Sequence, residues 1–291
     1  MLLGAGLGTR LHPLTDERPK PLVPVGDRTV LEHVAARLAE AGWSRLVVNA
    51  HSFADQMEEI CASLPLPTEV VIEETRPRGT AGGVAGARAA LGGGDVLVHN
   101  ADMLVELDLG ALVVAHTSFA ALATLAVQGG LPPNEGNVGV DAEGRIVRLR
   151  DRSFGREQAG ALFGGVQILS SEVSLPNEGC LVGDVYIPLL ERGLALAAAP
   201  VVGRFFDIGS PAAYLEANLA WLAGRQSYLG HDAVISPRVS VVSSVVGRGA
   251  RVDGAGPLER VVVWPGVRAR APLADAIVTR SRVVRASATR S

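Results

Sequence analysis

The start of the chain combines glycines with a strand exit in a pattern that suits phosphate binding. Gly4, Gly6 and Gly8 follow the short apolar run 1–3. Glycine adopts backbone angles that other residues avoid and lets backbone N–H groups approach an anion closely, which makes this loop a candidate phosphate-binding site. Thr9 stands where a dinucleotide-binding fingerprint needs its third glycine, and the Gly-Lys-Ser/Thr of a Walker loop is absent. The loop therefore belongs to neither of these familiar types.

Two cationic side chains follow the glycines, and one of them is unusual. Lys20 is the only lysine among the 27 Lys and Arg residues of the chain. A lysine ammonium is a compact point charge that an arginine fork does not replace between two phosphates. Pro19 and Pro21 restrict the backbone on both sides and hold Lys20 on a stiff, non-helical segment. We expect Lys20 and Arg10 to bind an anionic ligand; the alternative for Lys20 is an ordinary surface lysine in a turn.

Two carboxylates leave apolar runs at predicted strand ends. Asp102 ends the segment "DVLVHNAD", and Asp207 follows two phenylalanines in "FFDIGS". Their hard oxygen atoms suit Mg²⁺ bound to phosphates. Each aspartate alone would also serve as a helix N-cap or a turn residue.

The elements that must position these residues alternate along the chain. Short apolar runs and helical patterns give the order β-α-β-α, which predicts a Rossmann-like α/β fold: a mixed, mostly parallel sheet with helices on both faces. In such sheets ligands bind at the carboxyl ends of the strands. The segments at those ends are Gly4–Gly26, Glu74–Gly83, Asn100–Asp102 and Asp207–Gly209. Strands are expected at 1–3, 45–50, 69–74 and 95–102, and helices at 30–42, 54–64 and 82–91.

The middle of the chain interrupts this alternation. Residues 109–127 read as a helix followed by a strand rather than as a membrane span. Residues 137–149 predict a hairpin that turns at 142–144, followed by a strand at 160–169, which together form an antiparallel insertion. Helices resume at 184–193 and 211–224. Local signals support the assignments: a Thr29 and Glu32 capping box, Gly42 as a helix stop, and Pro211 in a first turn after Ser210.

Residues 226–291, the tail of the chain, have a different sequence pattern. Branched apolar residues recur at intervals of about six, at Val239, Val245, Val252, Leu258 and Val263. This period predicts a small parallel β-helix, and irregular strands packed against the first domain are the alternative. We therefore divide the chain into a catalytic domain, 1–225, and a hexapeptide-like β-helix domain, 226–291.

The composition of the chain indicates its cellular compartment and the kinds of ligand that it binds. The net charge is −3, but from residue 231 onward ten arginines face four acids. No aromatic residues alternate with these arginines, so a solvated surface is favoured over nucleic-acid binding. Two distant cysteines and six scattered histidines show no metal-ligand spacing. No signal peptide or membrane segment is evident, and we expect a soluble, cytoplasmic protein.

Residues 3–26, "LGAGLGTRLHPLTDERPKPLVPVG", resemble the signature loop of the sugar-1-phosphate nucleotidyltransferases, also called nucleotide-sugar pyrophosphorylases. The resemblance extends to about residue 222, and several members carry a left-handed β-helix tail. It implies that Arg10 holds the β- and γ-phosphates and that Lys20 contacts the α-phosphate or the sugar phosphate, as the catalytic pair. The implied nucleotide-binding residues are Leu3, Gly4, Ala5, Gly6, Gly8 and Thr9, with Gly79, Thr80 and Gly82 at the base. The implied sugar-phosphate residues are Asn100, Gly139, Gly165 and Arg150, and the implied Mg²⁺ ligands are Asp102 and Asp207.

The chain departs from the family in three places. The family carries a few more residues before the glycine loop. Ala101 replaces the glycine of its Asn-Gly-Asp. The usual Glu-Lys-Pro is absent after the hairpin, where Arg150 or Arg152 would substitute.

The resemblance implies transfer of a nucleotidyl group from a nucleoside triphosphate to a sugar 1-phosphate, with release of pyrophosphate. The "GTAG" at 79–82 is most like guanylyltransferases and some uridylyltransferases. A mannose- or heptose-1-phosphate guanylyltransferase is the first choice, ahead of a uridylyl- or thymidylyltransferase. The alternatives are a non-catalytic regulatory homologue that binds nucleotide sugars and a cytidylyltransferase for phosphocholine or another non-sugar acceptor. The base, the sugar and a possible homo-oligomer stay open at this point.

Overall fold

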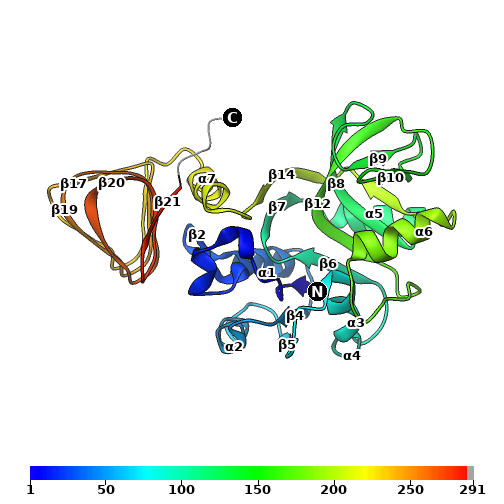
Figure 1. Cartoon of the computed structure of the whole chain (residues 1–291), viewed down its shortest axis with the longest axis horizontal. Coiled ribbons are helices and arrows are strands. Elements are labelled where there is room, and N and C mark those ends of the chain that lie inside the picture. Colours follow the sequence, from blue (N-terminus) through cyan, green and yellow to red (C-terminus); the bar gives the residue numbers. More distant parts are fainter. Residues whose placement is uncertain (287–291) are drawn as a thin grey trace. The chain divides into compact units, whose positions relative to one another are not determined.

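The computed structural model describes residues 1–286 and divides into two compact units (Figure 1). Unit 1 comprises Met1–Gly6 and Val34–Phe205, and unit 2 comprises Leu7–His33 with residues 206–286. The chain thus leaves unit 1 inside the glycine loop and enters it again inside the first helix. The division predicted at residue 225 stays a prediction.

Unit 1 is built on a ten-stranded mixed sheet. Its main path runs β11-β10-β9-β12-β6-β1-β4-β5, and β8 pairs with β12 and β13. The neighbours β6-β1-β4-β5 are parallel, whereas β12 is antiparallel to β6, β8 and β9. The strands are β1 (Leu2–Leu3), β4 (Leu46–Ala50), β5 (Thr68–Ile72), β6 (Val96–Asn100), β8 (Ala123–Leu131), β9 (Val138–Val140), β10 (Ile146–Leu149), β11 (Arg152–Ser153), β12 (Ala159–Leu169) and β13 (Ala197–Ala199). The predicted α/β class, with its antiparallel insertion, is confirmed.

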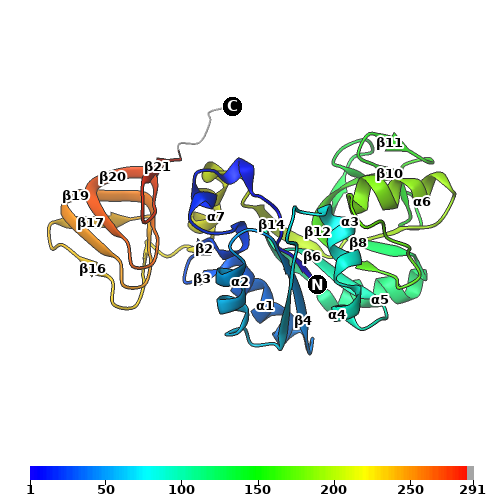
Figure 2. The same cartoon turned by 60° about the horizontal axis from the view of Figure 1, so that its bottom comes forward.

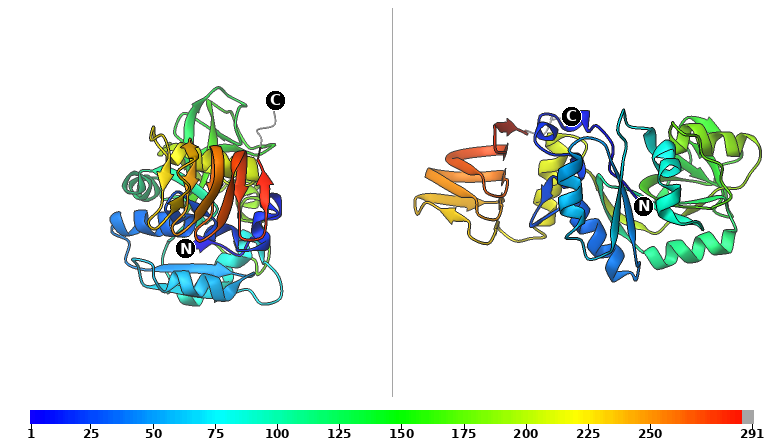
Figure 3. Two further views of the ribbon diagram at one scale, coloured as in Figure 1. Left: turned by 90° about the vertical axis from the view of Figure 1, so that its left-hand side faces the viewer. Right: turned by 90° about the horizontal axis from the view of Figure 1, so that it is seen from below.

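Helices cover the sheet from both sides. In the right panel of Figure 3, the blue α2 and the cyan α3 lie on opposite faces of the parallel strands, and Figure 2 labels both helices. The helices are α1 (Val30–Glu40), α2 (Ala54–Cys61), α3 (Gly79–Gly86), α4 (Arg88–Leu91), α5 (Leu109–Phe119) and α6 (Ile187–Glu191), the last preceded by a π-helical turn, η4 (Leu181–Tyr186). The single helix predicted at 82–91 is divided, because the helical repeat breaks at Ala87.

The predicted caps form as hydrogen bonds. The Glu32 carboxylate accepts from the Thr29 N–H at 2.7 Å, and the Thr29 hydroxyl accepts from the Glu32 N–H at 3.2 Å. Gly42 adopts φ +84° after α1. A further short ribbon, β7 (Met103–Leu107) with β14 (Val202–Asp207), was not expected for the residues after Asp102.

Unit 2 contains a stack of parallel strands. The pairs β15-β18, β18-β19, β16-β19 and β19-β20 are parallel, and Val245 lies opposite Val262, Val234 opposite Arg251 and Arg251 opposite Arg268. The strands are β15 (Tyr228–Leu229), β16 (Val234–Ile235), β17 (Val239–Val242), β18 (Val245–Val246), β19 (Arg251–Val263), β20 (Arg268–Val278) and β21 (Val283–Arg285).

The spacing of these pairs matches a solenoid. Each parallel pair joins positions about one coil of three six-residue faces apart. Figure 1 shows this stack with a triangular outline, and the left panel of Figure 3 shows its strands side by side. Of the five predicted inward residues, four are buried and Val239 is half-buried. The architecture is compatible with a β-helix.

The N-terminal part of unit 2 contacts helix α7 (Pro211–Trp221). It consists of three short turns and a small hairpin: η1 (Thr9–Leu11), η2 (Leu14–Asp16), η3 (Lys20–Leu22), β2 (Pro24–Val25) and β3 (Arg28–Thr29). The buried Tyr214 hydroxyl donates to the Pro24 carbonyl and accepts from the Trp264 indole N–H at 3.0 Å. The Arg18 guanidinium lies 4.6 Å from the Trp264 ring centroid. These contacts join the signature segment, α7 and the strand stack into one unit.

No helix within residues 1–286 has both the length and the apolar composition that a membrane crossing requires.

We expect Gly26→Ala to destabilise unit 2 strongly. Gly26 has φ +65°, and a Cβ there would lie 2.1 Å from the Trp221 ring. Gly249 also has φ +65° but has open space around it. Gly249→Ala should therefore cost about 1 kcal/mol for backbone strain alone, and Gly26→Ala at least about 3 kcal/mol. Urea unfolding of both variants measures the difference; equal losses would show that Trp221 moves aside freely.

Candidate active site

Asp207 lies between the two predicted catalytic cations. Its carboxylate is 3.5 Å from the Lys20 ammonium and 3.7 Å from the Arg10 guanidinium. The Lys20 side chain is only 8% exposed, whereas Arg10 is 75% exposed. A lysine is rarely buried without a charged partner, and the Asp207 carboxylate is a partner of this kind for Lys20. The alternative of an ordinary surface lysine is wrong.

The turn after Asp207 leaves room for this cluster. A Cβ on Gly209 would lie 3.0 Å from the Arg10 guanidinium nitrogen and 2.9 Å from the Asp207 carboxylate. The next residue, Ser210, caps α7 by accepting from the Ala213 N–H at 3.2 Å. The absence of a side chain at Gly209 leaves space for these two charged groups, and the helix cap is Ser210 rather than Asp207.

The signature segment is also tied to the last turn of the strand stack. The Glu17 carboxylate accepts hydrogen bonds from the Thr279 and Ser281 hydroxyls and from the Arg280 and Ser281 N–H groups. Burial acts to raise the pKa of Glu17, but these hydrogen bonds outweigh it and hold the pKa below its usual value. The tail therefore fixes the backbone three residues before Lys20.

The boundary between the two units falls within the sequence of the predicted phosphate loop. Leu3, Gly4, Ala5 and Gly6 belong to unit 1, and Gly8 and Thr9 belong to unit 2 with Arg10 and Lys20. The Gly4 N–H donates to the Asn49 side chain at 2.8 Å. Gly8 has φ +60°, and a Cβ there would lie 2.9 Å from Thr15, so this position requires glycine.

The predicted base-binding residues begin α3. A Cβ on Gly79 would lie 2.4 Å from the Gly179 carbonyl oxygen, and one on Gly82 would lie 2.5 Å from the Asn177 carbonyl oxygen. The Thr80 hydroxyl accepts from the Leu181 N–H at 2.7 Å. The small residues of this segment therefore allow α3 to pack closely on the backbone at 177–181.

Three predicted residues lie together at the end of β6. Asn100 ends the strand and Asp102 follows it, and both are half-buried. A Cβ on Gly165 would lie 3.2 Å from the Asn100 amide nitrogen. The neighbouring His99 is buried, and burial lowers its pKa to about 4. The imidazole is consequently neutral near pH 7.

The remaining sugar-phosphate candidates lie around the hairpin. The Arg150 guanidinium is exposed and lies 3.5 Å from the Cys180 sulfur. Gly139 packs against Glu157, which forms a buried ion pair with Arg148 at 2.7 Å. The alternative Arg152 pairs instead with Glu191. Arg150 is therefore exposed and contacts a sulfur atom, whereas Arg152 is paired with a carboxylate.

The arrangement of the His, Cys, Asp and Glu side chains limits how a metal ion could bind. Within residues 1–286, no three His, Cys, Asp or Glu side chains cluster in a way that would hold an ion. Asp102 is in unit 1 and Asp207 in unit 2. Mg²⁺ commonly binds through one or two carboxylates together with substrate phosphates and water, and each of these two side chains is a carboxylate of that kind. Their joint role stays a prediction.

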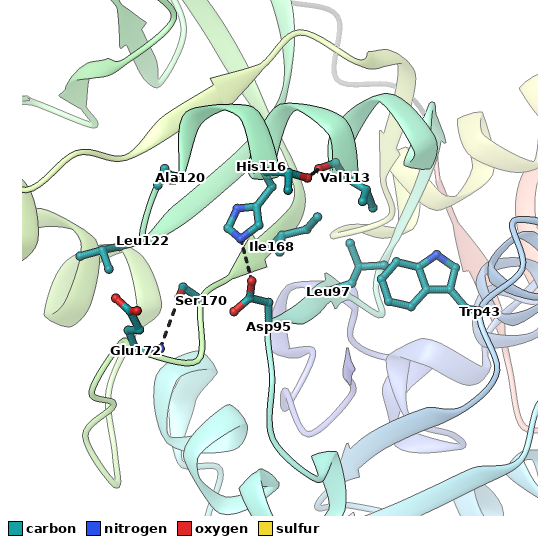
Figure 4. A pocket seen from close by; sticks show the side chains of 12 residues that line it. Trp43, Asp95, Leu97, Val113, His116, Ala120, Leu122, Ile168, Ser170 and Glu172 are labelled. Carbon is teal, nitrogen blue, oxygen red and sulfur yellow. Dashed lines mark hydrogen bonds and ion pairs between the residues drawn. The ribbon is translucent and has the colours of Figure 1, made fainter.

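One cavity of about 460 Å³ lies elsewhere in unit 1 (Figure 4). In it the His116 ring lies 3.4 Å from the Asp95 carboxylate and bonds to the Thr124 hydroxyl at 2.9 Å. Asp95 precedes the first residue of β6, whereas Asn100 ends that strand, five residues or about 16 Å further along. The cavity contains none of the predicted site residues.

Sequence reasoning missed two buried residues, Asn49 and Glu73. Each is 2% exposed, and together they connect the glycine loop with the segment before α3. The sequence signal that could have indicated them is a polar residue near the carboxyl end of each of two apolar strand patterns.

We expect His99 to make the protein acid-sensitive. An unfolded histidine titrates near 6.5, so between pH 6.5 and 4 the unfolded chain binds more protons and stability falls as the pH falls. From pH 7.5 to 5 this group alone should remove about 2 kcal/mol from the free energy of unfolding. Urea unfolding of wild type and His99→Gln at both pH values measures it; an equal loss in the two proteins contradicts the assignment.

Comparisons with known proteins identify the family of the chain. The nucleotidyl transferase family model matches residues 1–224. A mannose-1-phosphate guanylyltransferase of Mycobacterium tuberculosis is 30% identical over 293 residues, covering 93% of this chain and 81% of that protein. An N-acetylmuramate alpha-1-phosphate uridylyltransferase of Caulobacter vibrioides is 33% identical over 238 residues, covering 76% of this chain and 96% of that protein. The solved structure of HddC from Yersinia pseudotuberculosis complexed with GMP-PN has the same fold, with a TM-score of 0.61 at 22% identity over 76% of this chain and 97% of that one. The chain belongs to the nucleotidyl transferase family.

Proposed function

We propose that this chain transfers a nucleotidyl group from a nucleoside triphosphate to a sugar 1-phosphate, with guanylyl transfer to a mannose- or heptose-type acceptor as the first choice. The observation that carries the proposal is the approach of Arg10 and Lys20 to one carboxylate, Asp207. The guanylyltransferase relative aligns with 93% of this chain, which supports the choice of base. The "GTAG" of 79–82 agrees with that choice.

The reaction needs positive charge more than proton transfer. A sugar-phosphate oxygen attacks the α-phosphorus, a new P–O bond forms, and the bond to the β-phosphate oxygen breaks to release pyrophosphate. The nucleophile is already an anion, so no general base is required. The protein must offset the repulsion between two polyanions by positioning and electrostatics. In this proposal Lys20 contacts the α-phosphate, and Arg10 binds the β- and γ-phosphates.

Mg²⁺ is the proposed cofactor, with Asp102 and Asp207 as its protein ligands. When bound, the ion would neutralise phosphate charge. Asp207 has a second task in the absence of substrate, because its carboxylate orients Lys20 and Arg10.

A second candidate is uridylyl transfer to an acidic amino sugar phosphate. The uridylyltransferase relative, which this chain covers almost completely, favours it. N-acetylmuramate carries a carboxylate on its lactyl group, and the exposed Arg150 of the predicted sugar site would pair with such a group.

Pyrophosphate release with a panel of substrates tests the proposal. The panel combines GTP, UTP, dTTP and CTP with mannose, glucose and N-acetylmuramate 1-phosphates and with phosphocholine. We expect GTP with mannose 1-phosphate to react fastest and EDTA to abolish the reaction until Mg²⁺ is restored. UTP with N-acetylmuramate 1-phosphate as the fastest pair would establish the second candidate. Release with none of the sugar phosphates would contradict sugar nucleotidyl transfer.

We expect Lys20→Arg to lose at least about 100-fold in kcat/KM although it keeps the charge. The buried site has room for an ammonium beside Asp207, and a planar fork cannot occupy the same position. Lys20→Met is the matched variant without charge, and the melting temperature of each reports folding. A rate for Lys20→Arg close to wild type would remove lysine geometry from the mechanism.

A further inference from the structure

A buried chain of hydrogen bonds joins the glycine loop to the segment before α3. The Gly4 N–H donates to the Asn49 side-chain oxygen at 2.8 Å. The Asn49 amide donates to one Glu73 carboxylate oxygen at 2.7 Å. The other oxygen of Glu73 accepts from the Arg78 N–H at 2.7 Å. Two side chains therefore connect two backbone segments that lie 74 residues apart, all within unit 1.

The two side chains have no freedom to reorient. Each is 2% exposed. Asn49 is inside β4, and the backbone of Glu73 is fixed by its N–H, which donates to the Ala50 carbonyl at 2.8 Å. A Cβ on Gly83 of α3 would lie 2.6 Å from the Asn49 amide nitrogen, so the helix closes over the pair. Figure 1 shows where β4, β5 and α3 lie.

The loop between Glu73 and Arg78, which the hydrogen bond between these two residues spans, is otherwise largely exposed to solvent. Glu74, Thr75 and Arg76 are exposed, and the ion pair of Arg76 with Glu178 is an exposed contact at 2.7 Å. Exposed pairs of this kind fix little. The Glu73 carboxylate is the buried anchor that sets where Arg78, and hence Gly79 after it, begins the helix.

We propose that Asn49 and Glu73 are positioning residues that set nucleotide affinity and base selection by holding Gly4 and Arg78 at a fixed separation. The inference rests on the proposed function, in which Gly4 belongs to the phosphate loop and Gly79 to the base-binding segment. A nucleotide that spans both segments binds tightly only when their spacing matches its length.

The chemistry of the pair provides a reciprocal test. In Glu73→Gln, the new amide cannot accept from both donors, so one buried N–H faces another N–H. In Asn49→Asp, two carboxylates face each other. In the double variant Asn49→Asp with Glu73→Gln, the new aspartate accepts from the Gly4 N–H and from the new glutamine amide, and the glutamine oxygen accepts from the Arg78 N–H. The double variant therefore restores all three hydrogen bonds and the total charge.

Steady-state kinetics give the first readout. We expect each single variant to raise the KM for the preferred nucleotide by roughly tenfold, to reduce the GTP to UTP preference, and to leave the KM for the sugar phosphate within about twofold. The double variant should recover most of the loss. Glu69→Gln, the same substitution at a site on β5 that is exposed and pairs with Arg45 at 3.5 Å, is the control and should match wild type.

Hydrogen exchange measured by mass spectrometry gives a second readout that needs no activity. Peptides that cover residues 1–10 and 74–83 should exchange faster in both single variants and at the wild-type rate in the double variant. An inactive wild type would defeat the proposed function, and exchange would still decide whether the pair holds the two segments. Unchanged exchange in the single variants, or a folded double variant that recovers neither exchange nor KM, would overturn the inference. If a single variant fails to fold, recovery of folding and KM in the double variant supports the inference, and its absence refutes it.

Discussion

The buried ammonium of Lys20 beside the Asp207 carboxylate is the constraint on which the candidate site depends. The burial of a lysine that is 8% exposed costs several kcal/mol of hydration, which an opposite charge offsets. The Asp207 carboxylate, 3.5 Å from the ammonium, supplies such a charge. This ion pair brings residues near position 20 together with residues near position 207, and Arg10 joins them through the same carboxylate.

The signature segment folds together with the end of the chain. Residues 7–33 share unit 2 with α7 and the strand stack. Tyr214 and Trp264 anchor the segment through buried hydrogen bonds, and Glu17 anchors it through the turn at 279–281. The tail is thus a structural support for the turn that carries Lys20.

Local signals in the sequence predicted much of this architecture. Thr29 with Glu32, Gly42, and Ser210 with Pro211 each mark a helix boundary by chemistry that acts within a few residues, and the structure has those boundaries. The signature residues around Lys20 and Asp207 were also found, because their types are rare in such surroundings. The Asn49 and Glu73 pair was not found. Its meaning depends on two donors, the N–H groups of Gly4 and Arg78, that are far away in the sequence and invisible as residue types.

The ion pair of Arg10 with Asp207 in unit 2 and the hydrogen bonds of Asn49 and Glu73 in unit 1 are held by different physical means. Arg10 is 75% exposed and Asp207 47% exposed, so their ion pair is weak and a phosphate can replace it at small cost. The hydrogen bonds of Asn49 and Glu73 are buried, and breaking one leaves an unsatisfied polar group at a cost of about 1–3 kcal/mol. The exposed Arg10 pair is therefore the contact that an incoming anion displaces easily, whereas the buried hydrogen bonds of Asn49 and Glu73 keep the spacing of the two segments that they join.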